Sequence, residues 1–209
     1  MKIFVDFDNT IFDTRHKFLD AFFGVFENYG VSREIFEETL PHFSKTTLQS
    51  GKCYSPERHI KIIKKNTGRD INEKVFLQEI SEFLEKLEKF VFEDFYAFVN
   101  QYNKEDLIIL SYGEQKFQQQ KIVGSGVEQF FRDTIITQDD KAVDIEKYMQ
   151  DFLDESAILI DDKAEYFENM KKLSIDTKTI HIIRDDKKCE NDNWCDMCVG
   201  NLRDVSGII

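Results

Sequence analysis

The 209-residue sequence has only two prolines and no apolar run long enough to cross a membrane. The shortage of proline excludes proline-rich linkers, and the lack of an apolar run of about 20 residues excludes a transmembrane helix. Asp6 interrupts the N-terminal apolar run too early for a signal peptide. These absences predict a cytoplasmic protein with no membrane partner.

Positive charge is also scarce. The chain has 28 Lys and Arg against 40 Asp and Glu, a formal net charge of −12. A surplus of this sign repels the phosphate backbone and excludes a nucleic-acid polymer as an electrostatic partner. A small phosphorylated ligand stays compatible with it, because a bound cation reverses the local field. The length predicts one domain, or one core with a modest insertion.

Cysteine is limited to Cys53, Cys189, Cys195 and Cys198. In a reducing compartment we expect thiols or metal ligands rather than disulfides. Cys195 and Cys198 have a spacing known from zinc sites, with Cys189 and His181 as further candidates, but no second pair exists. We therefore favour a core thiol for Cys198 in a final short strand at 197–199 over a zinc site.

Phenylalanine, in contrast, is abundant, with 20 residues. In the first half of the chain, apolar residues recur at helical spacing between 18 and 29, 60 and 63, and 76 and 87. Ser32 and Ser55-Pro56 are typical helix starts, and Gly30 and Gly68 are typical ends. Residues 15–90 are therefore predicted to be mostly helical, with no strong strand.

The second half alternates between strands and helices. Short apolar runs predict strands at 3–5, 107–110, 134–137, 157–160 and 179–183, with helices near 115–126, 142–153 and 163–173. Such alternation predicts right-handed crossovers and a parallel sheet. Continuous apolar strands indicate a sheet covered on both faces. The fold class is α/β, with a doubly wound, Rossmann-like core and an inserted helical segment.

Polar residues follow three of these strands, at the edge where such folds bind ligands. Several carboxylates at one edge raise each other's pKa unless a cation compensates them. Carboxylate oxygens suit Mg²⁺, which leaves one aspartate as a nucleophile and another as a general acid and base. A lysine and a serine there can hold phosphate oxygens. The candidate residues are Asp6, Asp8, Ser111, Lys141, Asp161 and Asp162.

Four segments, in order, resemble the motifs of the haloacid dehalogenase superfamily of phosphohydrolases. The first is the D-x-D-x-T run at residues 6–10, directly after the first strand. Ser111 follows the next strand, Lys141 shortly precedes a helix, and Asp161-Asp162 follow a later strand. The resemblance spans residues 6–162, which is most of the chain.

The resemblance implies roles for the first residues of this set. Asp6 resembles the nucleophile that forms an aspartyl-phosphate, and Asp8 the acid that protonates the leaving oxygen and then activates water. Thr10 helps to fix the loop and, with Ser111 and Lys141, belongs to the phosphoryl-binding group. An acid at position 8 favours phosphoryl transfer over dehalogenation.

The resemblance also implies a Mg²⁺ site. Asp161 and Asp162 would hold the ion together with Asp6 and the backbone carbonyl of Asp8. Glu165 competes with Asp162 as the second acid of this motif. Lys121 competes with Lys141 as the lysine, but it falls inside a predicted helix, so we interpret it as a solvated surface residue.

The helical segment 15–90 corresponds to the cap that this family inserts between its first two motifs, with the core at 1–14 and 91–209. Such a cap closes over the site and excludes water. Its phenylalanines at 18–26 are expected to pack between helices rather than to line a substrate pocket. Its polar residues near helix starts are expected on the surface: Arg15, His16, Lys17, His42, Lys52, Tyr54, Arg58 and His59.

The expected activity is Mg²⁺-dependent hydrolysis of a small phosphorylated metabolite. A phosphotransferase or phosphomutase with the same residues is an alternative, and a binding protein that keeps the fold without turnover is another. The acid at position 8 argues against the last of these. Neither the substrate nor the oligomeric state follows from the sequence.

Overall fold

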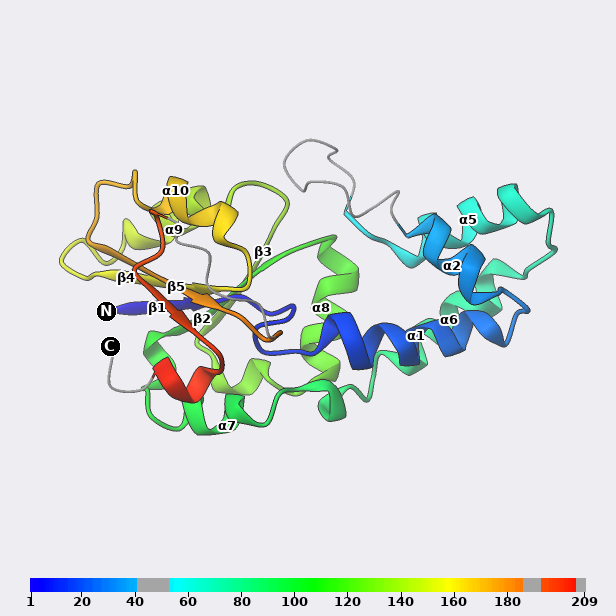
Figure 1. Cartoon of the computed structure of the whole chain (residues 1–209), viewed down its shortest axis with the longest axis horizontal. Coiled ribbons are helices and arrows are strands. Elements are labelled where there is room, and N and C mark those ends of the chain that lie inside the picture. The colour runs from blue at the N-terminus through cyan, green and yellow to red at the C-terminus, as the bar shows by residue number, and fades with distance from the viewer. Residues whose placement is uncertain (41–52, 186–192, 206–209) are drawn as a thin grey trace.

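The computed structural model describes residues 1–40, 53–185 and 193–205. A parallel sheet of six strands, in the order β3-β2-β1-β4-β5-β6, lies at one end of the molecule (Figure 1). The chain moves outward from β1 on one side and then returns to β4 on the other, which is the predicted doubly wound topology. The strands are β1 (Lys2–Val5), β2 (Leu107–Tyr112), β3 (Asp133–Thr137), β4 (Ala157–Asp161), β5 (Thr177–Ile182) and β6 (Met197–Val199).

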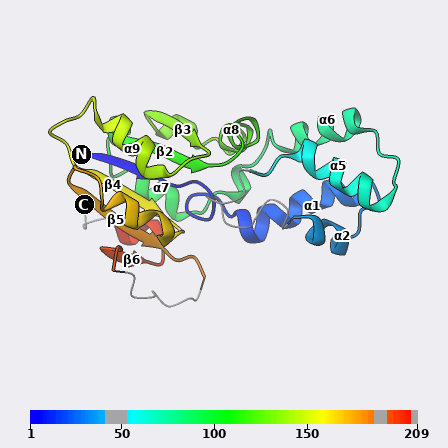
Figure 2. The same cartoon turned by 90° about the horizontal axis from the view of Figure 1, so that it is seen from above.

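Helices cover both faces of the sheet, as the continuous apolar strands predicted. Ile3 and Val5 on β1 join one apolar cluster, and Phe4 between them joins another on the opposite face. Figures 1 and 2 place α9 and α10 on one face and α7 on the other. The elements of this half are α7 (Asp94–Val99), α8 (Gln115–Gly124), α9 (Lys141–Met149), α10 (Phe167–Met170) and the short helices η3 (Lys104–Asp106), η4 (Glu128–Phe130), η5 (Ala164–Tyr166) and η6 (Leu202–Val205).

The segment between β1 and α7 forms a helical layer that extends away from the sheet (Figure 1). Ser55 accepts a hydrogen bond from the Arg58 N–H, and Gly68 ends the helix with φ +67°, as the sequence predicted. Ser32 caps a helix in the same way. The elements are η1 (Thr14–Phe18), α1 (Leu19–Glu27), α2 (Arg33–Thr39), α5 (Pro56–Thr67), α6 (Glu73–Phe83) and η2 (Glu88–Phe90).

Aromatic rings hold this layer together, as expected for the phenylalanine stripe. The Phe26 ring centroid lies 4.9 Å from those of Phe36, Phe76 and His59. The expectation that His59 is a surface residue is wrong, because its side chain is fully buried. Its Nε2 lies 2.7 Å from Thr39 Oγ1 and its Nδ1 3.0 Å from the Tyr54 hydroxyl, so both nitrogens keep partners away from water.

The other polar residues of this segment differ in their positions. Arg15, His16 and Lys17 are exposed, as expected, whereas Tyr54 and Arg58 are half-buried. His42 and Lys52 lie outside the described residues.

The predicted final strand is confirmed as β6, but the expectation that its cysteine is a free thiol is wrong. Cys198 is disulfide-bonded, whereas Cys53 and Cys195 do not belong to a disulfide. The expectation rested on the redox compartment alone, while pairing also depends on which sulfurs the fold brings together. Cys189 lies outside the described residues.

None of the helices within the described ranges is both long and apolar enough to span a membrane.

Candidate active site

The loop after β1 is a tight turn fixed from several sides. Asp6 is its first residue, and its N–H donates to the Ile160 carbonyl of β4 over 2.8 Å. Asn9 has a positive φ of 59°, a conformation that asparagine tolerates well. Thr10 is fully buried, and its carbonyl accepts a hydrogen bond from the Arg184 guanidinium. This contact is made by the main-chain carbonyl, whereas the buried Thr10 hydroxyl has no hydrogen-bond partner among the described residues, so the loop-fixing role of its side chain stays a prediction.

Lys141 lies between two buried carboxylates. Its Nζ is 2.5 Å from Asp6 Oδ1 and 2.6 Å from Asp161 Oδ2, and all three residues are buried. Asp140 caps the N-terminus of α9 and so places Lys141 at its first position. Burial acts to lower the pKa of Lys141, but the carboxylates of Asp161 and Asp6 outweigh it and raise the pKa. The lysine is therefore a fixed cation beside Asp6.

Three carboxylates meet at this edge. Asp6, Asp161 and Asp162 each present an oxygen, and these oxygens all lie within 4.8 Å of one another. Burial, and then the charge of Asp161, raise the pKa of Asp162 to about 6. The pKa of Asp6 is also raised, first by burial, with Asp161 and Asp162 adding to it against the opposing effect of Lys141. Besides Lys141, an Arg15 guanidinium nitrogen lies 3.7 Å from Asp162 Oδ2, but this arginine is largely exposed and compensates the cluster only weakly.

This donor set could hold a hard divalent cation such as Mg²⁺, which prefers carboxylate oxygens. Asn9 Nδ2 lies 3.3 Å from Asp162 Oδ2 and orients that carboxylate. Of the two candidates for the second acid of the last motif, Asp162 is part of the cluster and Glu165 is not among its members.

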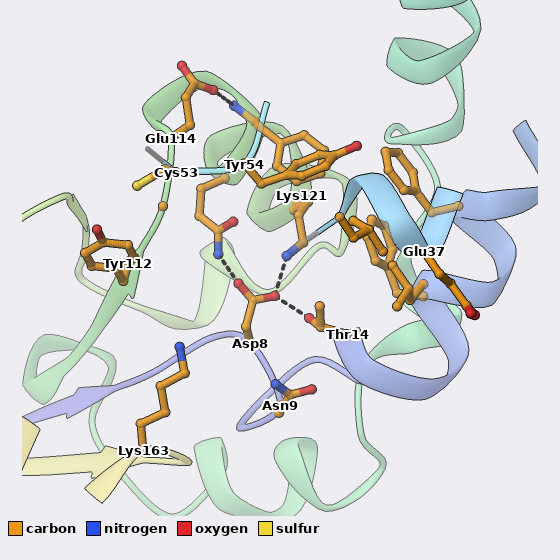
Figure 3. A pocket seen from close by; sticks show the side chains of 17 residues that line it. Asp8, Asn9, Thr14, Glu37, Cys53, Tyr54, Tyr112, Glu114, Lys121 and Lys163 are labelled. Atoms are coloured by element: carbon orange, nitrogen blue, oxygen red, sulfur yellow. Dashed lines mark hydrogen bonds and ion pairs between the residues drawn. The ribbon is translucent and has the colours of Figure 1, made fainter. Parts of the chain in front are cut away.

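The Asp8 side chain is held apart from this cluster. Its carboxylate accepts hydrogen bonds from Thr14, Gln118 and Lys121, all three visible in Figure 3. Burial acts to raise the pKa of Asp8, but the charge of Lys121 and the three hydrogen bonds outweigh it and lower the pKa. In this arrangement Asp8 is an oriented carboxylate.

The interpretation of Lys121 as a surface residue is wrong. Its exposed fraction is 2%, and its Nζ lies 5.2 to 5.7 Å from the centroids of four phenylalanine rings. The ion pair with Asp8 and the contacts with these aromatic rings together offset the free-energy cost of removing the Lys121 ammonium from water. Helical spacing places Gln118 and Lys121, three residues apart, on one face of α8, but it does not show that this face is buried. The rings are those of Phe7, Phe12, Phe18 and Phe117.

Ser111 is buried near the end of β2, and it is linked to Asp8 through Gln118. The Gln118 Nε2 lies 2.6 Å from Ser111 Oγ and also contacts the Asp8 carboxylate. Because Ser111 Oγ accepts this hydrogen bond, its own hydroxyl hydrogen is directed elsewhere. Gln118 was not among the residues predicted from the sequence.

A cavity of about 490 Å³ opens beside Asp8, between the sheet edge, α8 and the helical layer. It is lined by Lys163, from the loop after β4, and by Tyr54, from the helical layer (Figure 3). Phe22 of the helical layer lines it as well. The expectation that the phenylalanine stripe only packs between helices is thus incomplete, because Phe18 and Phe22 also border this cavity.

No family model matches the chain. No curated protein matches it either. Solved structures do. A structure assigned to the haloacid dehalogenase-like hydrolases, from Burkholderia xenovorans LB400, is similar with a TM-score of 0.72 and 19% identity, over 97% of this chain and 93% of the other.

Two further structures are similar over nearly their whole length. One is assigned to the same hydrolases, comes from Bacillus subtilis and is bound to magnesium, with a TM-score of 0.68 and 15% identity over 99% and 97% of the two chains. The other is the L-2-haloacid dehalogenase from Xanthobacter autotrophicus, with a TM-score of 0.67 and 10% identity over 98% and 96%. These likenesses confirm the fold that the sequence motifs predicted.

Proposed function

On this haloacid dehalogenase fold, we propose that the chain is a Mg²⁺-dependent phosphomonoester hydrolase that forms an aspartyl-phosphate on Asp6. One observation carries the proposal. Asp6 lies against Lys141 in a buried acidic cluster, while a second carboxylate, Asp8, is held separately and faces a cavity. Two carboxylates in different surroundings are what nucleophilic and acid–base roles require.

In the first step, an Asp6 carboxylate oxygen attacks the phosphorus, and the bond between phosphorus and the leaving oxygen breaks. Asp8 donates to that oxygen the proton that it accepted from water in the second step of the preceding turnover. Lys141 stays charged and offsets the negative charge that gathers between Asp6 and the phosphoryl oxygens. The hydroxyl hydrogen of Ser111 binds a phosphoryl oxygen, with Gln118 fixing its direction.

In the second step, Asp8 accepts a proton from water, and the water oxygen attacks the phosphorus of the aspartyl-phosphate. Phosphate leaves and the Asp6 carboxylate is restored. The lowered pKa of Asp8 suits this step, because its carboxylate form is the base. Residues 15–90 act in this proposal as a cap that limits the access of water.

Asp6, Asp161 and Asp162 would hold the Mg²⁺ ion, which supplies positive charge against the phosphoryl oxygens. The clustering of these three carboxylates supports this assignment, and a bound cation would oppose the rise in the pKa values of Asp6 and Asp162 that burial and mutual repulsion cause. The substrate in this proposal is a small phosphorylated metabolite.

Hydrolysis of 4-nitrophenyl phosphate, followed with and without Mg²⁺, tests the proposal. We expect Mg²⁺-dependent release of phosphate by the wild-type protein and its loss in Asp6→Asn. Halide release from 2-chloropropionate, measured in parallel, tests the dehalogenase reaction. Halide release without phosphate release would overturn the proposal, and so would unchanged phosphatase activity in Asp6→Asn.

A further inference from the structure

The cavity beside Asp8 has two chemically different ends. Lys163 and the Lys121–Asp8 ion pair lie at the end near the sheet, whereas Glu114 and Glu37 lie away from Asp8, on opposite sides of the aromatic side chains (Figure 3). The Lys163 ammonium suits a phosphoryl group, and the Glu114 carboxylate opposes a second negative charge away from Asp8, whereas Glu37 is already paired with Arg33. The cavity therefore favours a substrate with one phosphoryl group and no other anionic group.

Most of the wall between the two ends is apolar. Three rings contact one another in pairs, with the Tyr54 and Phe117 centroids 5.0 Å apart and Phe22 5.9 Å from each. The ring planes are inclined to one another by 51° to 74°. Such inclined rings offer faces and edges to a further aromatic ring. The remaining apolar lining residues are Phe18, Leu19, Leu40 and Cys53.

The polar side chains of this wall already have partners. The Tyr54 hydroxyl contacts His59, and the Tyr112 hydroxyl is hydrogen-bonded to Cys53. Glu114 accepts the Phe117 N–H at the start of α8. A substrate rich in hydroxyl groups would give up its hydration here without gaining equivalent hydrogen bonds.

From this cavity we infer that the organic part of the substrate is an uncharged aromatic or aryl-alkyl group, joined to the phosphoryl group through the leaving oxygen that Asp8 protonates. This inference rests on the proposed function. A cavity of about 490 Å³ has the size of known small-ligand sites, which run from about 300 to 1,000 Å³. The organic group of an aromatic phosphate makes favourable apolar contacts with this wall, whereas the hydroxyl groups of a sugar phosphate do not.

The kinetic test compares 1-naphthyl phosphate with glucose 6-phosphate in the presence of Mg²⁺. We expect KM for the naphthyl ester to be at least about tenfold lower, the effect of burying an aromatic ring in an apolar site. KM is compared because naphthol is the better leaving group and raises kcat by itself. A lower KM for the sugar phosphate, or equal KM values, would overturn the inference while leaving the hydrolase proposal intact.

Substitutions in the wall locate the effect. Leu19→Gln and Leu40→Gln change half-buried lining residues, and Leu153→Gln makes the same change at a leucine that is 83% exposed and lies outside the cavity. We expect the two wall variants to raise KM for naphthyl phosphate about fivefold or more, with the inhibition constant of inorganic phosphate unchanged. Leu153→Gln should change neither. An equal change in both constants in the wall variants, or no change in KM, would overturn the inference.

Calorimetric binding separates this inference from the proposed function. Tighter binding of naphthyl phosphate than of glucose 6-phosphate, weakened by Leu19→Gln, would support the aromatic site even if no phosphomonoester is hydrolysed. Equal binding of the two esters would overturn it even if both are hydrolysed.

Discussion

Lys121 on α8 forms an ion pair with Asp8, which lies 113 positions earlier in the loop after β1. The contact joins three parts of the molecule, because Thr14, at the start of the helical layer, donates to the same carboxylate. The buried ammonium faces phenylalanine rings on its other sides. Asp8 is thereby held as a charged group at the border between the sheet and the helical layer.

Removing this cation should impair turnover. Lys121→Met keeps an unbranched apolar chain among the rings but leaves the buried Asp8 carboxylate without its ion-pair partner. We expect kcat for 4-nitrophenyl phosphate to fall at least about tenfold, because acid–base catalysis depends on an oriented group. Steady-state kinetics measures this.

The matched control for Lys121→Met is Lys116→Met on the same helix. The Lys116 side chain is 69% exposed and pairs with Glu57 at the surface. The control should keep wild-type kcat, and both variants should keep the Mg²⁺ affinity of the wild type. Equal kcat values for the two variants would contradict the claim that Lys121 positions Asp8 for catalysis.

Magnesium should stabilise the folded chain through the acidic cluster. At a concentration 100 times its Kd, a ligand that binds only the folded state adds about 2.7 kcal/mol to the free energy of unfolding. For a chain of this size the melting temperature should rise by about 5–10 °C. Thermal denaturation with and without Mg²⁺ measures the shift.

Asp161→Asn should abolish this shift, since Asp161 belongs to the cluster. Asp154→Asn, at an exposed position in the turn before β4, should retain it. A full shift in Asp161→Asn would place the metal elsewhere.

The stability of the metal-free protein should depend on pH through Asp162. Its pKa is about 6 in the folded state against a usual 3.8, so the folded state holds the proton more tightly. Stability from this group is therefore present below pH 3.8 and is lost as the pH rises through 6. A shift of this size corresponds to at most about 3 kcal/mol.

Urea denaturation in EDTA at pH 4 and pH 7 measures this effect. Asp162→Asn should lose less stability between the two values than the wild type or Asp154→Asn. If all three proteins show the same difference between pH 4 and pH 7, Asp162 does not titrate in this range.

The Arg184 guanidinium should be important for the loop that holds the site. It lies 2.6 Å from Asp94 Oδ2 on α7 and also donates to the Thr10 carbonyl. Arg184→Met would leave Asp94 buried without its cation, which typically costs 3–5 kcal/mol. Arg132→Met, at a more exposed arginine paired with Glu105, should cost less than about 1 kcal/mol in urea denaturation. Equal losses in the two variants would contradict this ranking.

Much of the fold could be predicted because its signals are local. The apolar run at residues 3–5 marks the first strand, and the acidic pair at 161–162 marks the carboxyl end of a later one. The parallel topology brings the carboxyl ends of these strands together. The cap residue Ser55, followed by proline, likewise fixes a helix start from neighbouring residues alone.

The contacts around Asp8 could not be predicted in the same way. Lys121 has an ordinary sequence context in a helix, and only the packing of α8 against the loop after β1 makes it a buried partner. His59 is similar, because its two hydrogen-bond partners come from different segments. The cavity also combines residues from both halves of the chain, so its chemistry emerges only with the fold.

The central claim, that Asp6 forms an aspartyl-phosphate, is tested most directly by mass spectrometry of the peptide that contains Asp6. The reaction with 4-nitrophenyl phosphate and Mg²⁺ is first quenched with acid. The Asp8→Asn variant is the protein to use. Nitrophenolate leaves the substrate without needing a proton, so the first step proceeds, whereas the second step lacks its base and the aspartyl-phosphate accumulates. The account predicts a phosphoryl group on Asp6, absent from the same peptide of an Asp6→Asn, Asp8→Asn double variant. A phosphoryl group on another residue, or none on Asp6 while nitrophenol is released, would contradict it.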